Sequence, residues 1–181
     1  MTTKSVMAAV LASLLPSVAF ASCPDYLDQD LRKLHSKDTV NLCEVQAGGP
    51  MLVINTASHC GYTKQFKGLE ALNQKYAERG LAVVGFASND FRQEARDEEK
   101  AAEVCYVNYG VTFTMIAPSH VKGDDANPVF KALASQSDEP SWNFNKYLLD
   151  ADGNVVQKFG SNTSPDSDKL VSAIEALLPQ Q

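Results

Sequence analysis

The stretch from Met51 to Thr63 reads MLVINTASHCGYT, and the rest of the chain is organised around it. Its apolar run predicts a buried strand, and the loop that follows ends against the first turn of a helix. Open α/β sheets keep their binding and catalytic sites at the carboxyl ends of their strands. The loop therefore places Cys60 where chemistry is expected. A thiol there would meet unpaired backbone N–H groups and the positive end of a helix dipole, which favour the thiolate. Cys60 is therefore a candidate nucleophile, and a buried small hydrophobe is the alternative.

Strand and helix patterns alternate after this stretch. Residues 51–57 form the first buried run and residues 81–87 the second. Between them the apolar positions fall on one helical face and end at Gly80, namely Phe66, Leu69, Leu72 and Tyr76. This order predicts a right-handed crossover and parallel pairing of the two strands. The polar segment 88–96 should then lie at the same sheet edge as Cys60.

The second half of the chain continues the alternation. The patterns predict a helix from an acidic first turn at 97–99, a short strand at 111–116 and a helix from Asn127 and Pro128 to about 135. A hairpin follows, with strands at 144–150 and 154–159, and Ser164 and Pro165 open a last helix. Residues 26–34 are weakly helical. The whole order predicts an α/β fold with a mixed central sheet and helices on both faces.

The first 21 residues have the form of a secretory signal peptide. Lys4 supplies the positive charge, residues 6–15 are apolar, and residues 19–21 form a small-x-small cleavage site. A lipoprotein signal ending before Cys23 is the alternative, which Phe20 disfavours. The apolar run is too short to span a bilayer of about 30 Å, so no transmembrane segment is expected. We expect an exported protein, which is periplasmic if bacterial and secreted otherwise.

Composition limits the partners and the number of domains. The net charge is −6 and no basic cluster is present, which argues against nucleic acid or an anionic membrane as a partner. The chain after the 21-residue leader has the length of one domain. Residues 51–181 are its core, and residues 22–50 are an N-terminal extension that belongs to the same domain.

Four cysteines follow the leader: Cys23, Cys43, Cys60 and Cys105. An oxidising compartment favours disulfides, and four cysteines allow three pairings that the sequence does not separate. Position favours a structural bridge between Cys23 and Cys43, because the two flank the polar N-terminal stretch. Cys60 and Cys105 then remain for another purpose. No C-x-x-C is present and no histidine pairs with acids or thiols on a helix face, so neither a metal nor another cofactor is expected.

Five separated motifs together resemble the glutathione peroxidase family in its cysteine-containing, non-selenium form. They are NTASHCGYT at 55–63, GLEAL at 68–72, VGFASNDF at 84–91 followed by Gln93 and Glu94, NYGVTF at 108–113, and WNFNKYL at 142–148. The resemblance covers the chain from about Met51 onward. It implies a thioredoxin-like fold of three layers.

The resemblance also implies a catalytic set, with Cys60 as the peroxidatic residue and Gln93, Trp142 and Asn143 around it. An ordinary cysteine has a pKa of about 8.5, so fast attack on a peroxide needs donors that stabilise the thiolate. The amide and indole N–H groups of these residues are uncharged donors. They can also stabilise negative charge on the leaving oxygen.

The reaction so implied oxidises Cys60 to a sulfenic acid and reduces hydrogen peroxide or organic and lipid hydroperoxides. Cys105 matches the resolving cysteine of such enzymes, with packing in the core as the alternative. The oxidised enzyme would be recycled by a thioredoxin-like protein or by glutathione. The segment between Val111 and Trp142 is short and lacks the long insertion that tetramers of this family use for assembly, so the resemblance implies a monomer. The competing functions are an exported thiol-disulfide oxidoreductase, although Thr63 stands where its second cysteine would be, and a non-catalytic binding protein stapled by a disulfide.

Overall fold

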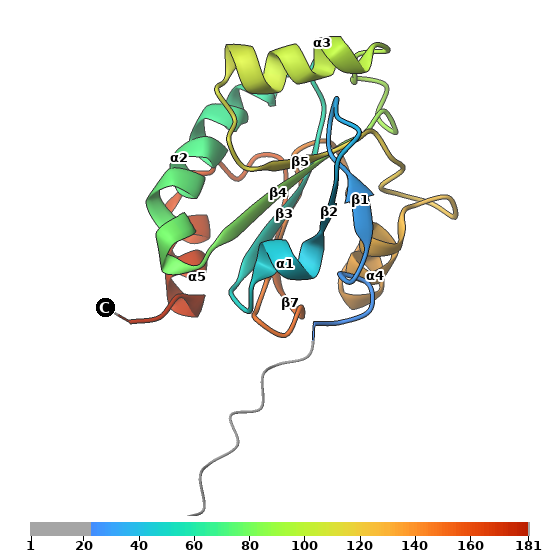
Figure 1. Ribbon diagram of the computed structural model, residues 1–181. Coiled ribbons are helices and arrows are strands. Elements are labelled where there is room, and N and C mark those ends of the chain that lie inside the picture. The colour runs from blue at the N-terminus through green and yellow to red at the C-terminus, as the bar shows by residue number, and fades with distance from the viewer. Residues whose placement is uncertain (1–22, 181) are drawn as a thin grey trace, which may run out of the picture.

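The computed structural model describes residues 23–180, in which a five-stranded sheet is covered by helices (Figure 1). The expected leader at 1–21 lies outside the described residues. Along this part of the chain no helix has both the length and the apolar character needed to cross a membrane.

The central sheet has the strand order β5-β4-β3-β6-β7. β3 (Met51–Thr56) pairs in parallel with β4 (Ala82–Ala87), which pairs in parallel with β5 (Thr114–Ile116). β6 (Lys146–Leu149) runs antiparallel to β3, and β7 (Val155–Phe159) runs antiparallel to β6. The mixed sheet and the antiparallel later strands are therefore as predicted. β5 is shorter than the expected 111–116.

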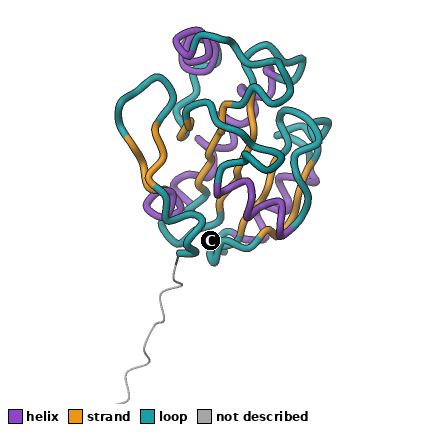
Figure 2. The backbone as a smooth tube through the Cα atoms, turned by 90° about the vertical axis from the view of Figure 1, so that its right-hand side faces the viewer, coloured by secondary structure: helices purple, strands orange, loops and turns teal. Residues whose placement is uncertain are grey.

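Alternating side chains of β3 divide the core into two clusters. Leu52 and Ile54 belong to a first cluster with α2 (Phe66–Tyr76), α3 (Glu98–Ala102) and α5 (Asp168–Leu177). Met51 and Val53 belong to a second cluster with α1 (Leu42–Gln46) and α4 (Pro128–Gln136). All six residues of β3 are buried, which explains its continuous apolar sequence. Helices cover both faces, and Figure 2 shows the strands of the sheet with helices around them.

Local sequence signals place several helix ends. The Asn127 side chain accepts from the N–H of Phe130, and Pro128 occupies the first turn of α4. Gly80 has a φ of 98° and ends the 3₁₀ turn Ala77–Arg79 that follows α2. The last helix starts at Asp168, later than predicted, because Ser164 and its neighbours form a turn in which Ser167 N–H donates to the Ser164 carbonyl.

The N-terminal segment is a hairpin, so the predicted helix at 26–34 is wrong. β1 (Asp30–Arg32) pairs antiparallel with β2 (Thr39–Asn41). The end of β1 and the residues directly after it run along the edge of the main sheet. There Leu34 N–H donates to Met115 O, and Ala117 N–H donates to Arg32 O. These edge contacts are distant in sequence, and the local pattern could not show them.

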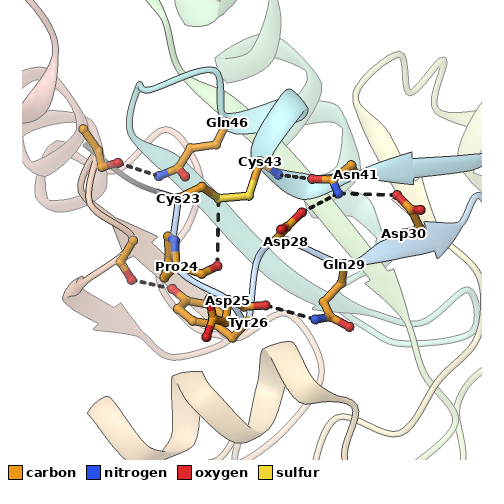
Figure 3. Close-up of a disulfide and its surroundings, with 12 residues drawn as sticks. Cys23, Pro24, Asp25, Tyr26, Asp28, Gln29, Asp30, Asn41, Cys43 and Gln46 are labelled. Atoms are coloured by element: carbon orange, nitrogen blue, oxygen red, sulfur yellow. Dashed lines mark hydrogen bonds between the residues drawn. A yellow bond between two sulfur atoms is a disulfide. The ribbon is translucent and has the colours of Figure 1, made fainter. Parts of the chain in front are cut away.

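A disulfide joins Cys23 to Cys43 with a Cα–Cα distance of 5.8 Å, while Cys60 and Cys105 are free (Figure 3). Cys43 lies in α1, and its N–H donates to the Asn41 side chain that caps this helix. The lipoprotein alternative would attach lipid to the Cys23 sulfur, but this sulfur is bonded to Cys43 in the structure. The bridge holds the hairpin against the second cluster of the core.

Candidate active site

Thr63 shapes the loop that carries Cys60. Its Oγ1 accepts from the N–H of Cys60 at 3.0 Å and donates to the carbonyl of Ala57 at 2.9 Å. Its own N–H donates to Cys60 O at 3.0 Å and starts the 3₁₀ turn Thr63–Gln65 (η1) that leads into α2. The loop is therefore closed on itself at the carboxyl end of β3, and Cys60 is held there with 8% of its surface exposed.

The Cys60 sulfur accepts a hydrogen bond from the backbone N–H of Tyr62, with a distance of 3.4 Å between Sγ and N. The donor is a neutral peptide group at the start of a helical segment. Such a donor stabilises a thiolate more than a thiol. The sulfur thus lies where the sequence pattern predicted.

The start of the Cys60 loop, at Ser58 and His59, is hydrogen-bonded to residues 93–95, which places Gln93 next to this loop. His59 N–H donates to Gln93 O at 2.9 Å. The Ser58 hydroxyl and N–H both donate to the Glu94 carboxylate, and Ala95 N–H donates to Ser58 Oγ at 2.9 Å. Burial raises the pKa of Glu94, and the hydrogen bonds from Ser58 and Ala95 oppose that shift. Glu94 therefore acts as the buried anchor of the Gln93 segment.

Asn143 completes a hydrogen-bonded amide pair with Gln93. Its Nδ2 donates to Gln93 Oε1 at 3.1 Å, and the residue is fully buried. Its Oδ1 is buried with no hydrogen-bond partner. Buried polar atoms are almost always paired, so this orphan acceptor calls for an explanation.

Asn55, at the end of β3, fixes the corner that carries Trp142 and Asn143. Its Nδ2 donates to Trp142 O at 2.9 Å, and its Oδ1 accepts from Asn145 N–H at 3.0 Å. Phe144 N–H donates to Asn55 O at 2.7 Å, and Phe144 has a positive φ of 59°. This left-handed residue turns the chain between the two buried asparagines, Asn143 and Asn145.

Trp142 lies at the surface of the site, with 40% of its area exposed. Its indole packs on Phe91, with ring centroids 5.3 Å apart. Hydrogen bonds thus connect the Cys60 loop, Gln93 and Asn143, while Trp142 joins them through its neighbour in the chain and through Phe91. The four candidate residues come from three separate loops at one edge of the sheet.

Cys105 lies in a π-helical turn, Glu103–Asn108 (η3), that continues α3. Its side chain is buried in the first core cluster, as is that of Cys60, so both thiols lie on one face of the sheet. Burial, and secondarily the Glu94 carboxylate, raise the pKa of Cys105 to about 12. This raised pKa favours the thiol form of Cys105 over the thiolate while the turn is folded.

Sequence reasoning missed the polar residues beneath the site, which are Ser58, Asn55, Asn145, Ser161 and Lys146. All five are buried. Lys146 donates to Gln65 Oε1 at 2.6 Å, and Ser161 Oγ donates to Asn143 O at 2.6 Å. A polar residue at the end of a fully buried strand was the signal that could have found Asn55 and Lys146. Over residues 23–180 no cluster of three or more histidine, cysteine or acidic side chains is arranged to hold a metal ion.

The chain is similar in sequence to known proteins of one family. The family model for glutathione peroxidase matches residues 29–134. A glutathione peroxidase-like peroxiredoxin of Schizosaccharomyces pombe is 43% identical over 137 residues, which are 72% of this chain and 85% of the relative. A glutathione peroxidase of Lactococcus lactis is 40% identical over 135 residues, covering 71% of this chain and 85% of that protein.

A solved structure shares the fold. The crystal structure of Trgpx in its apo form matches with a TM-score of 0.63 and 30% identity, covering 85% of this chain and 98% of that one. The expected thioredoxin-like α/β fold is therefore confirmed.

Proposed function

Because the chain belongs to the glutathione peroxidase family and is a thiol peroxidase acting on hydroperoxides, we propose that Cys60 is its peroxidatic residue and Cys105 its resolving residue. Gln93, Asn143 and Trp142 are the neutral donors around the sulfur. The observation that carries this assignment is the amide pair of Gln93 and Asn143, which lies beside the Cys60 loop with one buried atom unpartnered.

The first step is attack of the Cys60 thiolate on one peroxide oxygen. The S–O bond forms as the O–O bond breaks, so the sulfur is oxidised to a sulfenic acid and the hydroperoxide is reduced. The other oxygen leaves with the electron pair of the O–O bond and takes a proton to become water or an alcohol. The Tyr62 N–H that already contacts Sγ lowers the cost of holding the thiolate before attack.

The amide pair can serve both the substrate and the leaving oxygen. In the present arrangement the free Asn143 Oδ1 is an acceptor for the O–H of a hydroperoxide. If both amides turn by 180°, the hydrogen bond between them is kept and an Asn143 N–H takes the free position. That donor would stabilise negative charge on the leaving oxygen without placing a desolvated ion beside the sulfur.

The second step joins the two cysteines. The Cys105 sulfur attacks the sulfenic sulfur of Cys60, a disulfide forms, and the hydroxyl leaves as water. The Cys105 proton must be lost for this attack, and burial opposes that loss because it raises the pKa of Cys105 to about 12. Opening of the π-helical turn would expose the thiol and restore its ordinary acidity. π-helical turns are rare and are frequently found at functional sites, so this segment is suited to such a change.

A dithiol then reopens the disulfide. We propose a thioredoxin-like protein as reductant, with glutathione as the alternative, and hydrogen peroxide or organic and lipid hydroperoxides as substrates. Two relatives are named glutathione peroxidase-like peroxiredoxins, which favours thiol–disulfide recycling. We also propose a monomer that is exported, to the periplasm if bacterial, because a structural disulfide such as Cys23–Cys43 persists in oxidising compartments.

Rapid-mixing kinetics test the assignment. Hydrogen peroxide is mixed with the wild type, Cys60→Ser and Cys105→Ser, and oxidation is followed by the fluorescence of the single tryptophan. Wild type and Cys105→Ser should react at similar rates and Cys60→Ser should not react. Only the wild type should then form a Cys60–Cys105 disulfide after one equivalent of peroxide. A wild type that consumes peroxide no faster than Cys60→Ser would refute the peroxidatic role.

Turnover with each reductant decides the recycling step. Thioredoxin with its reductase should support steady turnover of the wild type but not of Cys105→Ser. Equal turnover of both proteins with glutathione would contradict resolution by Cys105. The thiol-disulfide oxidoreductase alternative is not favoured, because Thr63 at the second cysteine position makes three hydrogen bonds that shape the loop.

A further inference from the structure

Lys146 is fully buried at the first residue of β6, a central strand. It pairs with Ile54 of β3 and Phe159 of β7, so it lies at the sheet edge where β3 ends and the Cys60 loop begins. Buried lysines are rare unless they are paired with an acid. This one therefore has a position that hydrophobic packing does not explain.

Three hydrogen bonds occupy all three N–H donors of the Lys146 ammonium group. Lys146 Nζ donates to Gln65 Oε1 at 2.6 Å, to Phe144 O at 2.8 Å and to Thr163 O at 2.9 Å. These acceptors are an amide oxygen and two peptide carbonyls, and none of them is charged. Burial without a carboxylate lowers the pKa of Lys146 to about 8.

Each acceptor belongs to a segment of the proposed site. Gln65 ends the 3₁₀ turn that follows the Cys60 loop. Phe144 is the left-handed residue directly after Asn143, a conformation that bulky side chains rarely adopt. Thr163 lies in the loop that also contains Ser161.

Ser161 closes this network. Its Oγ donates to Asn143 O at 2.6 Å, and its carbonyl accepts from Gln65 Nε2 at 2.7 Å. The three segments are thus bonded to one another and, at their centre, to one ammonium. Strained local geometry at a site persists only when its surroundings over-determine it, as they do here.

We propose that Lys146 is a positioning residue of the peroxidase site, whose ammonium ties the Cys60 turn, the Asn143–Phe144 corner and the 161–163 loop into one fixed arrangement. The proposal rests on the proposed roles of Cys60 and Asn143. The hydrogen bonds of Lys146 go to Gln65, Phe144 and Thr163 and not to the Cys60 sulfur or the Asn143 amide, so it acts through Gln65 and Phe144. A neutral side chain of similar length cannot supply three donors at this point.

Two reactions of Cys60 separate positioning from general damage. Reaction with hydrogen peroxide needs the thiolate and the placed Asn143, whereas alkylation by iodoacetamide needs the thiolate alone. We therefore measure both rate constants for wild type, Lys146→Met and Lys146→Gln, with alkylation at Cys60 followed by mass spectrometry. Lys158→Met is the matched control, because Lys158 lies on the adjacent strand and makes one exposed hydrogen bond to Glu139 O.

The peroxide rate constant of Lys146→Met at pH 7 should fall at least tenfold, while its alkylation rate changes less than threefold. Lys146→Gln should show the same split and Lys158→Met should match the wild type. A peroxide rate within twofold of wild type would overturn the proposal, and so would a parallel fall of both rates. If Cys60→Ser consumes peroxide as fast as the wild type, both the proposed function and the positioning role are refuted. If Cys60→Ser is slow but Lys146→Met is as fast as the wild type, only the positioning role is refuted.

The wild type supplies a second test that needs no folded variant. Above pH 8 the ammonium loses a proton and can no longer fill three acceptors, so the ratio of peroxide to alkylation rate should fall between pH 7 and 9.5. The titratable neighbours on the segments that supply the acceptors are Cys60 and Tyr62, together with the exposed His59, Lys64 and Asp166. The paired strand β7 adds Lys158, whose ammonium makes an exposed hydrogen bond. Ionisation of Cys60 cancels in the ratio. A ratio that stays constant over this range overturns the proposal.

Discussion

Removal of the Cys23–Cys43 disulfide should destabilise the protein without changing its reaction with peroxide. The bridge closes a loop with a sequence separation of 20 residues. The chain-entropy model gives about 3 kcal/mol for a loop of this length, because the bridge restricts the unfolded chain. For a protein of this size, that loss corresponds to a fall of roughly 6–12 °C in melting temperature.

The native fold should survive this change because other contacts hold the segment. Leu27, Leu34 and Leu42 of the N-terminal segment are buried in the core. The Tyr26 hydroxyl donates to Gly153 O, and Gln46 Nε2 donates to Asp150 O at 2.9 Å (Figure 3). The cysteines of the bridge pack on the second core cluster, whereas Cys60 belongs to the first, so the site should keep its geometry.

Urea unfolding followed by circular dichroism measures the change. Cys23→Ser/Cys43→Ser is compared with the wild type and with the wild type after reduction, which serves as the control for the serine substitutions. Both perturbed forms should lose about 3 kcal/mol of unfolding free energy and should react with hydrogen peroxide within twofold of the wild-type rate. A loss below about 1 kcal/mol would refute the loop-closure argument. A tenfold loss of activity in the folded double variant would refute the separation of bridge and site.

Three further predictions concern the site and its charged groups. Gln93→Ala and Asn143→Ala should each slow oxidation by hydrogen peroxide about 10- to 100-fold in rapid-mixing experiments, since each removes a neutral donor. The folded pKa of Lys146 is lowered to about 8, so between there and its ordinary 10.5 the unfolded chain binds more protons. The unfolding free energy of the wild type, relative to Lys146→Met, should therefore rise with pH over that window, by up to about 3 kcal/mol, in urea titrations. Asp90 accepts a hydrogen bond from His120 at 2.6 Å and raises the pKa of that imidazole, so Asp90→Asn should return it toward 6.5, as measured by NMR.

Local sequence patterns predicted the core of the fold well. The continuous apolar runs of β3 and β4 and the helical spacing of α2 lie within short windows, and the structure has all three elements. The N-cap at Asn127 and the left-handed Gly80 are also local signals. The hairpin of β1 and β2 was missed, because its course depends on pairing with the edge of the main sheet.

The candidate site divides in the same way. Position after a buried strand pointed to Cys60, and family motifs pointed to Gln93, Trp142 and Asn143. The hydrogen bond between the two amides joins residues 50 apart in the chain, and no local pattern encodes it. The bond from Lys146 to Gln65 spans 81 residues and was equally invisible.

The sequence by itself determined the βαβ core, the place of Cys60 directly after its first strand and the presence of the uncharged side chains Gln93, Trp142 and Asn143 in separate motifs, because these depend on side-chain type and short-range spacing. Only the tertiary structure decided which polar groups beneath the site are paired, that Asn143 keeps one buried atom without a partner, and that Cys105 is held in a π-turn. Those features arise where loops from distant parts of the chain meet. Their hydrogen bonds and desolvation exist only after the sheet has brought the loops together.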